Sequence, residues 1–164
     1  MLIHESTHVE KKWTVRKYVS EAARLAGEAP YEVVEFKENV LLNEGIQLML
    51  DLLIGAGGTV YDNTNAYLGV GDDATAESAT QTGLLAASNL LYNGMEAGYP
   101  QRSAQTVTWR AVFADAEANF AWNEVSLSNA ATGNAGVNLN RRVPGDLGTK
   151  ASGSWTLDLD ITIS

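Results

Sequence analysis

The last eleven residues of the chain, Ser154 to Ser164, alternate between polar and apolar side chains without interruption. Successive side chains of a β-strand point to opposite faces of the sheet, so this alternation predicts a strand with one apolar face. The apolar face carries five residues: Trp155, Leu157, Leu159, Ile161 and Ile163. Such a strand is typical of an antiparallel sheet that buries one face, and it argues against an α/β core, whose strands are apolar on both faces.

A nearly continuous apolar run predicts the clearest helix of the chain, at about residues 43–54. Asn43 is a good N-cap residue, Glu44 lies at the positive end of the helix dipole, and Gly55 is typical of a C-terminal cap. Only two residues interrupt the apolar surface of this helix: Gln47 and Asp51. We therefore expect the helix to be buried on most sides, either at one end of a sheet or between two sheets.

Several shorter segments have strand character and are separated by turns rich in Gly and Asn. They span residues 66–71, 106–114, 119–128 and 136–143. The alternation slips at Asn123-Glu124, which indicates a bulge or a change of sheet. Residues 74–105 are expected to form long loops with one short helix near 83–88. The whole pattern predicts a mainly β fold, an antiparallel β-sandwich or jelly-roll-like barrel, with one buried helix.

The first 38 residues have no sustained period and are expected to form an extended N-terminal arm beside a body of residues 39–164. A short strand at 12–19 and a short helix at 20–27 are possible within the arm, but such pieces rarely fold without a surface to lie on. We expect the arm to contact a partner protein through its aromatic side chains. These are Trp13, Tyr18, Tyr31 and Phe36.

Composition limits the classes of function that remain. The 164 residues contain no cysteine, so disulfides and thiolate chemistry are excluded. The formal net charge is −9, and residues 39–164 hold thirteen acidic against five basic residues. A body of this charge repels phosphate backbones, so we expect no direct nucleic-acid partner. No apolar stretch is long enough to span a bilayer, and the first residues do not read as a secretory signal.

Candidate metal sites are weak. His4 and His8 have the spacing of two helical zinc ligands, but no third ligand is evident. Residues 62–65 and 72–73 supply oxygen atoms for a calcium ion, yet their spacing does not match a known calcium loop, and Asn and Asp are ordinary turn residues. We expect neither a metal nor another cofactor; whether calcium binds at residues 62–73 stays open.

Candidate catalytic groups are equally weak. Asp158 and Asp160 share one strand face at about 7 Å, near the separation of a glycosidase pair, but same-face acids on a wet strand are common. Among the tryptophans, Trp109, Trp122 and Trp155 fall on apolar strand faces and are expected in the core rather than in a sugar platform. We therefore predict no enzyme activity.

One polar pair is expected to be structural. Glu124 and the Arg141-Arg142 pair lie in neighbouring predicted strands, where they can form a partly buried ion pair across the sheet. We interpret this pair as a feature of the fold before any functional site.

Five short stretches together resemble a group of bacteriophage virion structural proteins. They are residues 39–45 (NVLLNEG), 65–73 (NAYLGVGDD), 120–124 (FAWNE), 139–141 (LNR) and 147–150 (LGTK). The resemblance covers most of residues 39–164 and none of the first 38. The relatives include capsid decoration (cement) proteins and tail-fibre-associated proteins. In fibre relatives a Gly-Leu-Phe tends to follow the Trp-x-Glu piece, whereas Val125-Ser126-Leu127 stands here.

The resemblance implies a non-enzymatic component of the virion, assembled in the host cytoplasm. The first expectation is a decoration protein that stabilises the head by bridging subunits of the major capsid protein, as a homotrimer. Two alternatives stay open: a tail component (fibre, baseplate or adaptor), and a carbohydrate-binding module for host-surface glycans.

Overall fold

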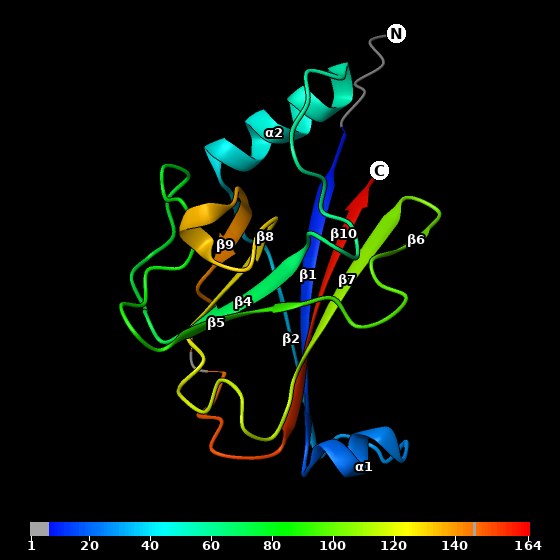
Figure 1. Ribbon diagram of the computed structural model, residues 1–164, viewed down its shortest axis with the longest axis vertical. Helices are drawn as coiled ribbons and strands as arrows, with labels where there is room; N and C mark the ends of the chain where they lie inside the picture. Colours follow the sequence, from blue (N-terminus) through cyan, green and yellow to red (C-terminus); the bar gives the residue numbers. More distant parts are fainter. Residues whose placement is uncertain (1–6, 146) are drawn as a thin grey trace, which may run out of the picture.

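Over its described residues, the protein is a sandwich of two five-stranded antiparallel sheets with two short helices, and these sheets are not closed into a barrel (Figure 1). The computed structural model describes residues 7–145 and 147–164. Sheet A has the order β2 (Glu32–Lys37), β1 (Val9–Tyr18), β10 (Ser154–Ile163), β7 (Thr106–Phe113), β6 (Gln101–Ser103). Sheet B has the order β3 (Val40–Leu41), β9 (Asn138–Arg142), β8 (Glu124–Ser128), β4 (Tyr67–Gly71), β5 (Leu90–Gly94). The predicted mainly β sandwich is confirmed; the barrel alternative is wrong.

The alternating C-terminal segment is strand β10, and its apolar face is the inner face of sheet A. Trp155, Leu157 and Leu159 are at most 3% exposed. The strand lies between β1 and β7 and pairs with both along nearly its whole length. Apolar side chains from sheet B meet this face, so that the core lies between the two sheets. The face assignment made from the alternation is therefore confirmed.

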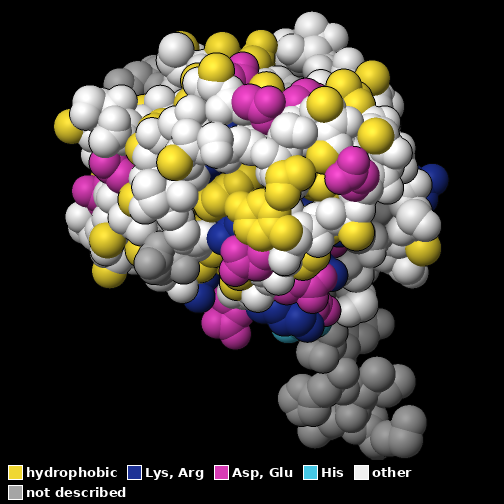
Figure 2. All heavy atoms as spheres, turned by 90° about the horizontal axis from the view of Figure 1, so that it is seen from below, with side chains coloured by type: hydrophobic (Ala, Val, Ile, Leu, Met, Phe, Trp, Pro, Cys, Tyr) yellow, Lys and Arg dark blue, Asp and Glu magenta, His cyan; other side chains and the backbone are white. Residues whose placement is uncertain are grey.

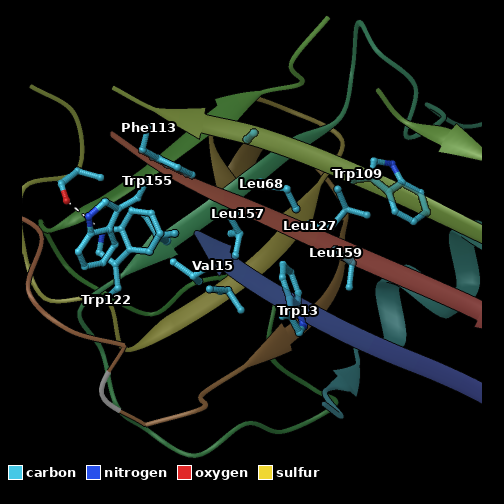
Figure 3. Packing of buried hydrophobic residues seen from close by; sticks show 14 of the residues in the cluster. Trp13, Val15, Leu68, Trp109, Phe113, Trp122, Leu127, Trp155, Leu157 and Leu159 are labelled. Atoms are coloured by element: carbon cyan, nitrogen blue, oxygen red, sulfur yellow. Dashed lines mark hydrogen bonds between the residues drawn. The ribbon is translucent and has the colours of Figure 1, made fainter. Parts of the chain in front are cut away.

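Aromatic side chains fill the core between the sheets (Figure 3). At one end, the ring of Trp122 lies 4.9 Å from the rings of both Phe113 and Trp155, edge to face. The indole nitrogen of Trp122 donates a 3.0 Å hydrogen bond to the carbonyl oxygen of Ala118. This arrangement satisfies the polar atom of a fully buried ring while its edges pack against other aromatic rings.

The N-terminal segment is not an extended arm over residues 9–37. Strand β1 lies in the interior of sheet A, with β10 on one side and β2 on the other. Trp13 and Val15 are fully buried in the common core, and Phe36 on β2 stacks on Trp13 with ring centroids 6.3 Å apart. The expectation was wrong because the apolar positions of β1 are too few to stand out among its charged residues. The charged residues of β1 lie next to charged side chains on the neighbouring strands β2 and β10.

Helix α2 (Asn43–Ile54) lies across one end of the sandwich and is far less buried than expected (Figure 1). Within the helix only Gly45 and Leu48 are buried. Its N-cap position is Leu42, not Asn43, and no side chain caps the helix there. The C-terminal cap is Gly55 as predicted, in the left-handed conformation at φ 72°. An apolar surface all round the helix does not show which side the fold covers.

The remaining elements agree with the sequence in part. Strands β4, β7 and β9 lie within the expected segments, whereas β8 begins only at Glu124, where the alternation slips. The short helix expected near 83–88 is absent from those residues. Strands β2, β3, β5 and β6 were not predicted. Helix α1 (Glu21–Leu25) is capped by Ser20, whose hydroxyl accepts a bond from the Ala23 amide.

Candidate interaction surfaces and the polar network that supports them

The most exposed apolar surface of the protein lies on α2, and we call it the α2 face. Its residues are Ile46 (37% exposed), Met49 (40%), Leu50 (55%), Leu53 (80%) and Ile54 (77%). Val60, in the loop after the helix, is also exposed, at 43%. Scattered exposed apolar residues need no explanation, but five on one short helix form a continuous patch of the kind that marks interaction sites.

The first turn of α2 is fixed rigidly to sheet B. Gly45 packs so closely on β9 that a Cβ atom there would lie 2.5 Å from the Cα of Leu139. A carboxylate oxygen of Glu44 accepts a 2.6 Å hydrogen bond from the backbone amide of Asn138. Because the attachment is concentrated in the first turn, the C-terminal half projects with its apolar side chains uncovered.

A second group of exposed apolar residues lies around the connection between β1 and β2, and we call it the α1-end group. Its residues are Val19 (66% exposed), Leu25 (71%), Tyr31 (59%) and Val33 (50%). Figure 1 places α1 and α2 at opposite ends of the long axis of the molecule. Seen from the α1 end, hydrophobic side chains gather near the middle of the face and charged side chains lie around them (Figure 2). The sandwich therefore carries apolar surface at both ends.

A buried ion pair joins strands β8 and β9 of sheet B. Glu124 and Arg141 are both fully buried, and their side chains meet at 2.7 Å. The carboxylate of Glu124 also accepts bonds from the backbone amides of Leu85 (3.0 Å) and Ala86 (2.8 Å). Gly71 leaves room for this carboxylate, because a Cβ atom there would lie 2.4 Å from Oε1 of Glu124. The ion pair predicted from the sequence is thus present, between Glu124 and Arg141.

The same pair holds the long segment between β4 and β5. The guanidinium of Arg141 donates to the carbonyl oxygen of Thr75 (2.8 Å) and to the side chain of Gln81 (3.0 Å). It also contacts Asp73 at 3.3 Å, and the bond from the Thr75 amide to Asp73 is the main reason that the pKa of this carboxyl lies below its usual value. Arg142 pairs separately with Glu77 at 2.6 Å. The segment is therefore fastened to sheet B by these ion pairs, together with neutral hydrogen bonds such as that from the Leu84 amide to the hydroxyl of Tyr92.

Lys150 occupies a nest of oxygen atoms in the loop after β7. Its ammonium donates to the carbonyl oxygens of Ala114 and Glu117 and to the side chain of Asn119, each at 2.8 Å. The residue is fully buried, and burial lowers the pKa of its ammonium. An internal cation thus satisfies carbonyl groups that would otherwise lack donors inside the protein. Lys150 belongs to one of the five stretches that carry the virion resemblance, and its contacts here are structural.

The acidic pair considered for catalysis is engaged in the outer face of sheet A. Asp158 accepts bonds from Arg16 (2.7 Å) and from two nitrogens of Arg110 (2.7 and 2.6 Å). Asp160 accepts a bond from the hydroxyl of Thr108 at 2.5 Å. The two carboxylates therefore have different partners and do not converge on a shared space.

The oxygen atoms considered for calcium are likewise used by the fold. Asp62 accepts bonds from the amides of Thr64 (3.1 Å) and Asn65 (2.9 Å), as turn residues of this type do. Asp72 accepts a bond from Asn89 at 2.7 Å. Over residues 7–145 and 147–164, no three His, Cys, Asp or Glu side chains are grouped so that they could hold a metal ion. His4 lies outside the described residues.

The four aromatic residues expected at a partner interface have different environments. Trp13 is fully buried, so its indole is not available to a partner. Tyr18 and Phe36 are half-buried, and Phe36 packs against the core. Tyr31 is exposed and belongs to the α1-end group. Trp109, Trp122 and Trp155 are at most 9% exposed, so tryptophan side chains offer no stacking platform for a sugar.

Sequence reasoning missed the α2 face as a surface. Its residues were assigned to the core because nothing in an all-apolar helix distinguishes a covered side from an open one. A usable signal was nevertheless present: Gly45 and Glu44 mark the side that approaches other backbone closely, and the residues opposite to them are the exposed ones.

Comparison of the chain with protein-family models, curated proteins and solved structures gave no match. In the described part of the chain no helix has the length and apolar character needed to cross a membrane. The interpretation of function therefore depends on the surfaces, on the network beneath them and on the short virion-like stretches.

Proposed function

We propose that this protein is a non-enzymatic structural component of a bacteriophage particle, and specifically a decoration protein that bridges subunits of the capsid. The observation that carries the proposal is the presence of two apolar surfaces, the α2 face and the α1-end group, at opposite ends of one sandwich. A bridging protein needs two separate contact surfaces on a body that does not deform between them. Many weak contacts of this kind act together on a shell through avidity.

Four of the five stretches that resemble virion proteins serve one structural unit, and this supports the proposed function. Residues 39–45 start α2, residues 65–73 form β4, and residues 120–124 and 139–141 bring Glu124 to Arg141. Together they build sheet B, anchor the helix that carries the α2 face, and fasten the segment between β4 and β5. The resemblance therefore lies in residues that stabilise sheet B and the elements attached to it, including the helix that exposes the α2 face.

The decisive experiment is to locate the polypeptide in purified particles by electron microscopy and to count its copies by quantitative mass spectrometry. We expect hundreds of copies per particle, distributed over the head. A few copies, or a few dozen, confined to the tail would replace the capsid assignment with the tail alternative. Absence from the particle would contradict the proposal altogether.

A binding experiment tests the surfaces themselves. Purified protein is added to particles that lack it, and the bound amount is measured for Leu25→Glu, in the α1-end group, and for Gln105→Glu as the control. Gln105 is exposed outside both apolar surfaces, so its variant adds the same negative charge elsewhere. We expect Leu25→Glu to reduce loading at least tenfold and Gln105→Glu to leave it unchanged. Equal loading of the two variants would contradict a role for the α1 end.

The carbohydrate-binding alternative has less support, because the tryptophan side chains that could stack on a sugar are buried. It predicts binding to a glycan array with assembly unaffected. A glycan-dependent signal that persists when the α1-end group is altered would favour this alternative over capsid decoration.

A further inference from the structure

The exposed side of α2 has the spacing of a helix-pairing seam. Ile46, Leu50 and Leu53 follow each other at intervals of four and three residues, so they lie in one row along the helix. This row faces away from Leu48, which is buried against the sandwich. Intervals of four and three are those by which one helix packs its side chains between the side chains of another. The seam is therefore shaped for a second helix.

The seam carries no charge. Its neighbours on the helix surface include Asn43 and Gln47, which are neutral. The helix has two charged residues, and one of them, Glu44, is bound to the backbone amide of Asn138. The other is Asp51, which lies about 100° around the helix from Leu50 and so outside the exposed row. A chain with a net charge of −9 thus presents, at this end, a surface on which two copies can meet with few like charges between them.

We propose that the α2 face binds the α2 face of a second copy, with the two helices antiparallel and Leu50 next to the two-fold axis. In this arrangement Ile46 of each copy lies beside the C-terminal end of the other helix, near Ile54. The inference concerns the isolated chain, so it does not rest on the virion assignment. If that assignment also holds, the α2 face joins two copies rather than contacting the capsid, and the pair bridges capsid subunits through its two α1 ends, which point away from each other.

The exposed area is sufficient for a pair. The exposed fractions of the α2 face and Val60 correspond to on the order of 600 Å² of apolar surface per copy, near the roughly 800 Å² per partner of a standard interface. The face lies at the end of the long axis, where α2 crosses the sandwich, so a second body can approach (Figure 1). A two-fold axis also requires a self-complementary patch, and one helix row paired with itself is such a patch.

The antiparallel orientation follows from electrostatics. It places the positive N-terminal end of each helix beside the negative C-terminal end of the other. A parallel arrangement would place like ends of the two helix dipoles side by side. Net repulsion between copies of the same charge remains, so salt should strengthen the association by screening it.

The first test measures mass. Multi-angle light scattering and sedimentation over a concentration series are expected to show a monomer–dimer equilibrium that shifts toward dimer when salt is raised. Leu53→Glu should weaken dimerisation by about 30-fold or more, as loss of a central interface residue does. Leu25 is a comparably exposed leucine at the other end (71% against 80% for Leu53), and Leu25→Glu should leave the equilibrium unchanged. A monomer at all concentrations, or a dimer unaffected by Leu53→Glu, would overturn the proposal.

The second test fixes the geometry and uses the absence of cysteine from the chain. Leu50→Cys should form a disulfide-linked dimer rapidly under mild oxidation. Ile46→Cys alone should not, because two positions 46 lie about 12 Å apart along antiparallel helices, beyond disulfide reach. A mixture of Ile46→Cys and Ile54→Cys should cross-link. Self-cross-linking of Ile46→Cys, or a trimeric mass, would contradict the antiparallel pair and indicate parallel helices instead.

Discussion

Replacing Arg141 by Met is the most informative single perturbation of this fold. The change keeps the aliphatic stem and removes the guanidinium, so the carboxylate of Glu124 stays fully buried without its charged partner. Removing one partner of a buried ion pair lowers the free energy of unfolding by about 3–5 kcal/mol, because the remaining charge is uncompensated. The backbone amides of Leu85 and Ala86 still donate to Glu124, so we expect the lower half of this range. Even that is a large part of a typical total stability of about 5–15 kcal/mol.

The assay is equilibrium unfolding in urea, followed by the fluorescence of the buried tryptophans. Arg102→Met is the matched control, because Arg102 is exposed and donates only to the carbonyl oxygen of Ala104. Its cost should be below about 0.5 kcal/mol. The double variant Glu124→Gln/Arg141→Met should be more stable than the sum of the two single losses implies, since the two groups are coupled.

Proteolysis provides an independent measurement on the same variants. Arg141 holds Thr75 and Gln81 directly, so its loss should expose the segment of residues 72–89 while the sheets remain folded. This segment contains no Lys or Arg, so a protease that cleaves beside Leu84 or Leu85 is required rather than trypsin. If Arg141→Met lowered the free energy of unfolding by less than about 1 kcal/mol, or left cleavage of the segment unchanged, the Glu124–Arg141 pair would not be what holds this segment on sheet B.

Three further predictions concern the core, the stability at alkaline pH and the first turn of α2. Trp122→Ala should cost about 3–5 kcal/mol in urea unfolding, since it removes a fully buried ring from the aromatic cluster; a cost below about 1 kcal/mol would contradict the packing. Burial raises the pKa of Tyr92 to about 12. The unfolded chain loses this proton first, near pH 10, so the free energy of unfolding should fall by about 2–3 kcal/mol between pH 10 and 12. Tyr92→Phe should make this decline shallower, and parallel curves would refute the assignment. Gly45→Ala should destabilise the protein by about 1–3 kcal/mol or detach the first turn of α2, because its Cβ meets backbone atoms of β9; unchanged stability and unchanged helix content in circular dichroism would contradict that contact.

Strands in which polar and apolar residues alternate cleanly could be predicted from the sequence, because the apolar residues mark the face that turns toward the core. In β10 the apolar positions Trp155, Leu157 and Leu159 are buried as predicted, whereas Ile163 is 53% exposed, and Ser154, Thr156 and Asp158 on the opposite face are buried as well. Strand β1 was underestimated, since its charged residues obscure the apolar positions Trp13 and Val15. The charged residues on the polar face of β1 are paired with charges on strands that are distant in sequence, and no local pattern reveals such partners.

Strands β5 and β6 were missed for a different reason. Their sequences, LLYNG and QRS, have no clean alternation or are too short for one. They are strands because β4 and β7 offer open edges for them to pair with. A strand specified by its neighbour rather than by its own residues is beyond a reading of local patterns.

The polar network could be predicted in part. Complementary charges in adjacent strands indicated Glu124 with the arginine pair, but only the fold shows that Arg141 takes Glu124 and Arg142 takes Glu77. The nest around Lys150 left no signal, because its ligands are mainly backbone carbonyl groups. The residues of the α2 face were assigned to the core because the helix is apolar on nearly every side. Which side of a short helix packs against the fold depends on close contacts such as that of Gly45 with β9.

The pairing of β1 with β10 has a consequence for biosynthesis. The register joins Val9 to Ile163, and the backbones of His8 and Ser164 exchange hydrogen bonds. The central seam of sheet A therefore links the earliest and the latest parts of the described chain to leave the ribosome. Contacts of such long sequence separation are slow to form, and the apolar face of β1 must wait uncovered until translation has delivered β10. During that interval the uncovered face favours aggregation of the nascent polypeptide.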